Sequence, residues 1–231
     1  MKKLCFVFAA LMTVATVLLL SSCAPAETDI SERRTNYFTA SDEAFTVTAV
    51  SGMRETPYET DGAVARMISY TLITVAPTDK TVFDVTASCE YEADVPVDPD
   101  KSGESAGKKF GGALIVHPFA ASYSAEFAYE ATDTFTVAVL YAENGEKRRR
   151  EYKMTSLVTP EMMTYDSAVS AAENEFEISG AHETRVRLIS NPVGEGLCWY
   201  VAFYYPDGKN CGVLLDPTTA KVLAKRSDRT E

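Results

Sequence analysis

The sequence predicts a mainly β (α+β) protein, in which a β-sandwich is followed by a small unit with one helix and a three-stranded antiparallel sheet. Apolar and polar residues alternate along several short segments of the first two thirds of the chain, as in strands with one buried and one wet face. Helical spacing of apolar residues follows Thr164, and an aromatic hairpin comes next. The composition changes after Thr159 and Pro160, which separates the two parts.

The strands of the sandwich are predicted within residues 43–159. Alternation is clearest in four segments: Phe45–Ala49, Phe83–Tyr91, Tyr123–Tyr129 and Phe135–Tyr141. Residues 63–75 and 111–116 add two less regular strands, and another follows Asn144 and Gly145. About seven strands at this spacing are typical of a β-sandwich. At this level of pattern the region resembles an immunoglobulin-like domain, although it lacks that family's Cys, Trp and Cys framework.

Residues 160–231 are predicted to form the second unit. Thr164 is a suitable N-cap for a helix of about three turns, and Ala168 and Ala172 share one face of that helix. Three segments are expected to form the antiparallel sheet that this helix covers: residues 184–190, 197–205 and 210–216.

This unit resembles a PepSY domain. The resemblance lies in the spacing of Ala168 and Ala172, in the strand "WYVAFYY", and in the ending "LLDPTTAKVL". Asp216, Thr219 and Val222 match the family's ending, whereas Ala220 replaces its usual glycine. The resemblance implies an exported module that associates with ligands or proteases and is often proposed to inhibit peptidases. It supplies no catalytic residues.

The start of the chain has the pattern of a signal peptide. Lys2 and Lys3 precede a 17-residue apolar run, Leu4–Leu20, which is short for a permanent membrane span. The sequence "LSSC", ending at Cys23, resembles the lipobox of bacterial lipoproteins. This resemblance implies removal of residues 1–22, a diacylglyceryl group on Cys23, and a position on the extracytoplasmic side of the cell membrane. A cleaved soluble product and an uncleaved anchor are the alternatives.

Residues 23–42 are polar and aperiodic, and we expect them to form a lipidated tether between the membrane and the folded part. Removing residues 1–22 leaves 209 residues and changes the formal net charge from −11 to about −13, because the removed segment holds two lysines and no acid. Such acidity argues against a nucleic-acid partner. The expected partners are the membrane, through Cys23, and a protein or peptide of the envelope.

The sequence lacks the motifs of common active sites. His117 and His182 are isolated, and no serine elbow, zinc-protease helix or recognisable cysteine nucleophile is present. The loop from Asp98 begins like a calcium loop, but Lys109 occupies the position of its bidentate glutamate. Two scattered histidines do not make a zinc site. We therefore expect no catalytic residue, metal or other cofactor.

Three cysteines follow the lipobox, and we expect all of them to be buried small hydrophobes. A hairpin turning at Pro206–Lys209 would set Cys211 opposite Tyr204 and leave Cys198 about 20 Å away along the strand. That separation is too large for a disulfide. Cys89 is the third cysteine.

The first candidate binding surface is a basic hairpin tip. A two-residue turn at Asn144 and Gly145 pairs Arg148 with Tyr141 and places Arg150 on the same face. The arginines can then stack on aromatic rings and contact phosphate headgroups or an acidic partner. The alternative is a solvated tip that compensates nearby acids.

The second candidate surface is the aromatic strand of the C-terminal hairpin. Trp199 and Phe203 share one face of this strand, and Tyr200 and Tyr204 share the other. We expect the tyrosines to point outward and bind a partner, since each can leave its hydroxyl in water. The alternative is that this face packs against the sandwich.

These features predict a lipid-anchored extracytoplasmic binding or interaction protein that is not an enzyme. Its PepSY-like unit would engage or restrain a peptidase or another envelope partner. One alternative is an envelope-polymer hydrolase whose carboxylate pair the sequence does not reveal. Another is a structural accessory subunit of an envelope complex.

Replacing Cys23 tests the anchor. Cys23→Ala should shift the protein out of the detergent phase in a phase partition, because the acyl chains supply its membrane affinity. The matched variant Cys5→Ala, within the apolar run, should partition like the unchanged protein. Mass spectrometry that finds an unmodified mature N-terminus away from Cys23 would end the lipoprotein interpretation.

Overall fold

The computed structural model describes residues 30–56, 61, 64–78, 88–93, 108–113, 115–117, 122–143 and 145–229. These residues confirm a mainly β protein with one large sheet and the helix α2 (Tyr165–Glu173). The strands are β1 (Ile30–Ser41), β2 (Phe45–Thr56), β3 (Arg66–Pro77), β4 (Ser88–Ala93), β5 (Lys108–Ala113), β6 (Ile115–His117), β7 (Ser122–Phe127), β8 (Phe135–Glu143), β9 (Glu146–Ser156), β10 (Glu183–Ser190), β11 (Leu197–Tyr204), β12 (Asn210–Leu215) and β13 (Val222–Ser227). Within the described ranges, no helix has the length and apolar character that a membrane span requires.

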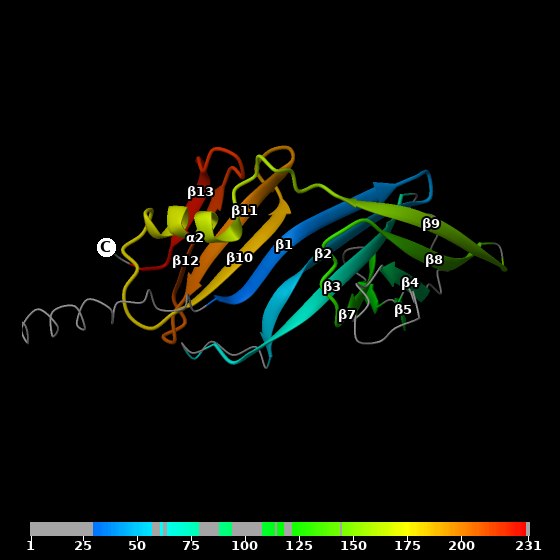
Figure 1. The fold of residues 1–231 in the computed structure, drawn as a ribbon, viewed down its shortest axis with the longest axis horizontal. Helices are drawn as coiled ribbons and strands as arrows, with labels where there is room; N and C mark the ends of the chain where they lie inside the picture. Colours follow the sequence, from blue (N-terminus) through cyan, green and yellow to red (C-terminus); the bar gives the residue numbers. More distant parts are fainter. Residues whose placement is uncertain are drawn as a thin grey trace, which may run out of the picture.

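One path of paired strands runs along the whole molecule in the order β13-β12-β11-β10-β1-β2-β3-β7-β6. Strands β5, β4, β8 and β9 form a second path, which joins the first where β9 pairs with the end of β1. In Figure 1, α2 lies against the sheet at one end of the molecule, and β4, β5, β8 and β9 lie at the other end. Strand β1 therefore connects the two ends.

Residues 30–41 form strand β1, so the prediction that they belong to a tether is wrong. The first half of β1 pairs in parallel with β10, and most of its length pairs antiparallel with β2. The polar composition of these residues is not typical of a central strand, so the sequence did not indicate one. Their polar side chains have partners within the fold: Arg33 donates to the Tyr165 hydroxyl on α2 at 3.1 Å, and Glu32 is buried among charged and phenolic groups. The remaining tether residues, 23–29, lie outside the described ranges.

A first hydrophobic cluster lies between the two paths of strands. It includes Phe38 from β1, Phe45 and Val47 from β2, and a set from β8 and β9: Phe135, Val137, Val139, Tyr141, Tyr152 and Met154. The rings of Phe38 and Phe135 meet edge to face with centroids 5.0 Å apart, and Phe45 and Tyr141 do the same. The alternation predicted for residues 45–49 and 135–141 is thereby confirmed, since every second residue of each segment is buried.

A second hydrophobic cluster lies under α2. The helix begins as predicted, with the Thr164 hydroxyl accepting the Ser167 N–H at 3.3 Å, and it buries Ala168, Val169 and Ala172. The facing residues are Val186, Leu188, Trp199, Val201, Phe203, Val213 and Leu215. The Trp199 indole N–H donates to the Met163 carbonyl at 3.2 Å, which ties the segment before the helix to β11.

The predicted sheet of three strands is incomplete. Residues 222–227 form a fourth antiparallel strand, β13, which pairs with β12, and β1 adds a parallel strand beside β10. The turn before β13 forms around the Asp216 carboxylate, which accepts the N–H groups of Thr218 and Thr219 at 3.0 and 2.8 Å. Ala220 has a φ of 60° there, in the left-handed region that glycine adopts more easily.

The two predicted hairpins have different outcomes. The register of β8 and β9 is confirmed, with Tyr141 opposite Arg148 and Val139 opposite Arg150. The C-terminal hairpin is displaced by one residue, so that Cys211 lies opposite Phe203 instead of Tyr204, because five residues form the loop. Cys198 and Cys211 are buried free thiols, as expected; the side chain of Cys89 lies outside the described part.

A glycine permits the irregular pairing of β1 and β2. The register shifts between Arg34 and Asn36, which brings the β1 backbone close to Gly52. A Cβ atom on Gly52 would lie 1.9 Å from the Arg33 carbonyl oxygen. Only a residue without a side chain fits here unless β1 moves.

Gly52→Ala should therefore lower the free energy of unfolding by about 3 kcal/mol, because backbone atoms must shift to admit the methyl group. Urea denaturation followed by circular dichroism measures this change. The control is Gly194→Ala, in an exposed loop, where the nearest atom is the side-chain nitrogen of Asn191 at 3.0 Å. Equal losses in the two variants would show that the β1 shift does not depend on Gly52.

Candidate functional site

Arginines and tyrosines gather on the face of the sheet opposite α2. One row of directly paired residues crosses five strands, from β1 to β13: Arg34, Arg187, Tyr200, Leu214 and Ala224. The neighbouring row on the same face contains Glu32, Arg185, Ala202, Gly212 and Arg226. With Tyr204, these two rows make up what we call the arginine–tyrosine face.

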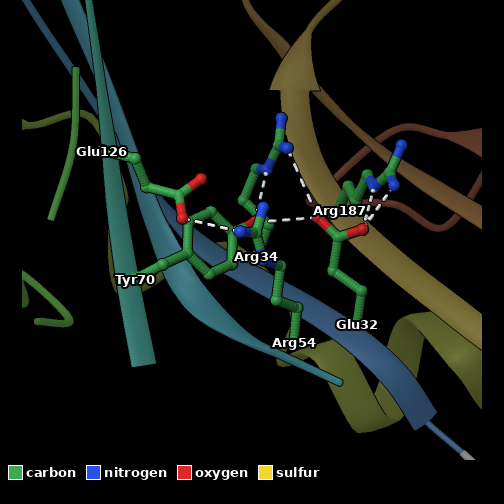
Figure 2. Close-up of polar contacts among 6 residues, drawn as sticks. All are labelled: Glu32, Arg34, Arg54, Tyr70, Glu126 and Arg187. Atoms are coloured by element: carbon green, nitrogen blue, oxygen red, sulfur yellow. Dashed lines mark hydrogen bonds and ion pairs between the residues drawn. The ribbon is translucent and has the colours of Figure 1, made fainter. Parts of the chain in front are cut away.

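Glu32 lies at the centre of a buried ionic cluster (Figure 2). Its side chain accepts the Tyr70 hydroxyl at 2.8 Å and Arg34 Nη2 at 3.3 Å on one oxygen. The other oxygen accepts Arg187 Nε at 2.9 Å and a second bond from Arg187 Nη2. Burial raises the pKa of Glu32, but the bonds and charges of Arg187, Tyr70 and Arg34 outweigh it, so the pKa falls below its ordinary value. Glu32 is therefore an anion between two cations.

Tyr70 extends this cluster to β2 and β7. Its hydroxyl donates to Glu32 and accepts Arg34 Nε at 3.1 Å, and burial next to Glu32 raises its pKa to about 12. The guanidinium of Arg54 lies 5.0 Å from the centre of its ring and pairs with Glu126 at 2.6 Å. The cluster therefore links β10, β1, β2, β3 and β7 on one face of the sheet.

A groove of about 480 Å³ opens on the arginine–tyrosine face. Its lining includes three arginines and no acidic residue: Arg34, Arg187, Ile189, Pro192, Tyr200, Gly212, Val213, Leu214, Ala224, Lys225 and Arg226. The ammonium of Lys225 does not add to this charge, because it bonds Glu175 at 3.2 Å on the α2 face. The Tyr200 ring lies over Gly212, where an added Cβ atom would come within 3.3 Å of Tyr200 Cε2. A small residue at position 212 thus leaves room for the ring.

The two tyrosines predicted to bind a partner lie on this face, and Trp199, Val201 and Phe203 pack under α2, so the predicted assignment of faces is confirmed. The hydroxyls of Tyr200 and Tyr204 do not simply point into water, because they lie 3.3 Å apart and bond to each other. The Arg185 guanidinium covers the Tyr204 ring at 3.9 Å from its centre. Burial and the bond to Tyr204 raise the pKa of Tyr200 to about 12.

The two predicted arginines of β9 lie elsewhere and differ from each other. Arg150 donates to Asp42 at 2.5 Å, to Glu43 at 2.7 Å and to the Tyr141 hydroxyl at 3.0 Å. It therefore joins β9 to the turn between β1 and β2 instead of offering a charge to a partner. The Arg148 side chain is exposed, and its Nη2 lies 3.8 Å from Oε2 of Glu146. Neither arginine meets Tyr200 or Tyr204, because β1 and β10 separate β9 from β11.

Asp42 holds this second ionic group together. Burial raises the pKa of Asp42, but the backbone N–H groups of Phe45 and Ala44, with Arg150 and the Tyr152 hydroxyl, together outweigh this effect and lower the pKa to about 2. The pKa of Tyr152 rises through burial and its bond to this carboxylate. The group stabilises the junction between the two paths of strands.

The other residues considered from sequence form no further site among the described residues. His182 bonds through Nδ1 with the Gly180 carbonyl at 2.9 Å and packs beside Phe203. In the described part of the chain, no three His, Cys, Asp or Glu side chains are placed to hold a metal ion. Cys23, the side chain of His117 and most of the loop from Asp98 to Lys109 lie outside the description.

Sequence reasoning missed the charged members of the face. Arg185 and Arg187 alternate with Val186 and Leu188, which is the pattern of a strand with one apolar and one cationic face. This alternation can be recognised in the sequence. The pairing of β10 with Glu32 and Arg34, more than 140 positions earlier, cannot be recognised there.

No protein family, no curated protein and no solved structure matches this chain.

Replacing the buried carboxylate tests the cluster. Glu32→Gln should lower the free energy of unfolding by about 3 kcal/mol at neutral pH, because it leaves Arg34 and Arg187 without their anion. Since the pKa of Glu32 is lowered, its contribution is complete above the ordinary value of 4.5 and is lost as the pH falls through the lowered pKa. The difference between the unchanged protein and the variant should then shrink in acid.

Urea denaturation at a series of pH values measures both effects. The control is Glu126→Gln, which breaks the half-exposed pair with Arg54 and should cost about 1 kcal/mol or less. A pH-independent difference for Glu32→Gln would contradict the ionic role of Glu32.

Proposed function

We propose that the chain is a lipid-anchored extracytoplasmic binding protein and that the arginine–tyrosine face is its binding surface. The observation that carries this proposal is the groove, which is lined by cationic residues and a tyrosine in a protein whose formal net charge is −11. Such a local reversal of charge favours an anionic ligand or an acidic patch on an envelope protein or peptide.

Three of the four arginines of this face are held in place before any ligand arrives. Glu32 fixes Arg34 and Arg187 from below, and Arg185 is stacked on Tyr204. Side chains that are already ordered lose less conformational entropy on binding. A face built in this way suits recognition more than solubility alone.

The architecture that we propose for this function has four parts. Residues 1–22 are a signal peptide and Cys23 is the lipidated N-terminus; residues 43–159 form an immunoglobulin-like β-sandwich; residues 160–231 form a PepSY-like unit. The cluster between the two paths of strands supports the sandwich, and α2 packed on β11 supports the PepSY-like unit. Because β1 begins seven residues after Cys23, an anchor there would hold β1 within about 25 Å of the membrane.

Glu32 does not have the chemistry of the general acid of a hydrolase. A glycoside hydrolase needs a carboxylic acid whose pKa is raised so that it can donate a proton. The pKa of Glu32 is instead lowered by two arginines and Tyr70, which suits a permanent counter-ion. Restraint of a peptidase, as the PepSY resemblance implies, remains one form that the proposed binding can take.

A double variant tests this proposal. Tyr200→Ala with Tyr204→Ala should weaken crosslinked capture of the envelope partner in intact cells by about 2 kcal/mol, because the two rings are central to the face. The variant should stay folded, since the Trp199 face is unchanged, although it loses the bond between the two hydroxyls. Thermal unfolding followed by circular dichroism checks this.

The control for that experiment is Leu157→Ala with Val158→Ala, which removes two exposed apolar side chains after β9. Capture that survives the tyrosine variant, or that falls equally in the control, would exclude the arginine–tyrosine face as the binding surface.

A further inference from the structure

Three arginines from three different strands line the groove, although Arg34 directs its guanidinium toward Tyr70 and Glu32. Arg34 comes from β1, Arg187 from β10 and Arg226 from β13, and the Tyr200 side chain lies on β11 between them. Glu32 offsets one of these charges. The contact of Arg226 with Asp228, at 2.9 Å, is made by a side chain that is 81% exposed, so water screens it. The groove therefore keeps an excess of positive charge.

The groove also has an apolar wall. Ile189, Pro192, Leu214 and Ala224 line it together with the Tyr200 ring. Its volume of about 480 Å³ falls in the range of small-molecule sites, roughly 300–1,000 Å³. The space is thus large enough for an organic group as well as an inorganic anion.

We propose that this groove binds a phosphate ester, with the phosphate between Arg187 and Arg226 and the organic part against Tyr200 and Leu214. This inference rests on the proposed function, which makes the arginine–tyrosine face the binding surface. Guanidinium groups match the geometry of phosphate oxygens through paired N–H bonds. A phosphate monoester carries up to two negative charges and three terminal oxygens, so it can engage several guanidinium groups at once, whereas a carboxylate offers one charge and two oxygens.

Two sources can supply such a group, a phospholipid headgroup or a soluble phosphate ester. The first row of the face begins at Arg34, four residues after the start of β1, so a membrane anchor at Cys23 would hold Arg34 within about 40 Å of the lipid headgroups. The phosphate chemistry is the same for both sources, and the experiment below separates them.

The test uses residues 23–231 carrying Cys23→Ala, so that neither the signal segment nor an acyl chain contributes to binding. Calorimetric titration with phenyl phosphate measures the soluble ester, and benzoate serves as the carboxylate of similar size. Sedimentation with phosphatidic acid vesicles, compared with phosphatidylcholine vesicles, measures the headgroup. We expect phenyl phosphate to bind more tightly than benzoate. Sedimentation with phosphatidic acid vesicles but not with phosphatidylcholine vesicles would show that a lipid headgroup can also supply the phosphate. If the protein binds phenyl phosphate and sediments with neither kind of vesicle, the groove binds soluble esters.

Two variants locate the binding. Arg226→Gln removes an exposed guanidinium outside the Glu32 cluster and should weaken phenyl phosphate binding about tenfold. Ala224→Glu places a negative charge in the groove and should weaken it at least as much. The matched control, Arg149→Gln, removes an exposed arginine of β9 that pairs with Glu151, and should change binding by about twofold or less.

Three results would overturn the inference: no binding of either phosphate probe, equal binding of benzoate, or equal loss in Arg149→Gln and Arg226→Gln. The first two leave the proposed function standing if the tyrosine variant still loses partner capture in cells. Both proposals would be wrong if the variants of this face kept both phosphate binding and partner capture.

Discussion

The structure depends on the neutralisation of one buried carboxylate, that of Glu32. Strand β1 lies in the middle of the sheet with β2 on one side and β10 and β9 on the other, a position that apolar side chains usually fill. Glu32 can occupy it because Arg34, Arg187 and Tyr70 satisfy both of its oxygens. An ion pair of this kind adds little net stability compared with apolar packing, but the loss of one partner is costly. Pairing of β1 with β10 therefore matters, because it brings Arg187 to Glu32 and avoids the cost of a buried carboxylate that lacks this partner.

The same strands present two chemically different faces, because successive residues of a strand point in opposite directions. On β11, Trp199, Val201 and Phe203 form the core under α2, while Tyr200 and Tyr204 join the arginines. On β10, Val186 and Leu188 pack under the helix and alternate with Arg185 and Arg187. Packing under α2 thus positions the opposite face, so that a rigid core supports the groove without taking part in it.

A second ionic group holds the other end of the molecule together in a more exposed setting. Asp42, Arg150 and Tyr152 connect the turn after β1 with β9, and the Arg150 and Asp42 side chains retain 31% and 27% of their exposure. Solvent weakens such a pair, whereas the backbone N–H bonds to Asp42 do not depend on a second side chain. Arg150, which the sequence indicated as a binding residue, therefore has a structural role. The excess of positive charge lies on the arginine–tyrosine face instead.

Local features follow from neighbouring residues and could be predicted from them: α2 with its cap at Thr164, the alternation of β8, the turn at Gly145 that sets the β8–β9 register, and the division of β11 into an apolar and a tyrosine face. Other features depend on contacts between residues far apart in the chain, and only the folded chain reveals them. Residues 30–41 are a central strand only because β2 and β10 pair with them, and their buried charge needs Arg187, which follows Glu32 by 155 positions. The arginine–tyrosine face exists for the same reason, since its rows join β1 to β10–β13, and side-chain patterns within one segment carry no record of which distant strand will lie beside it.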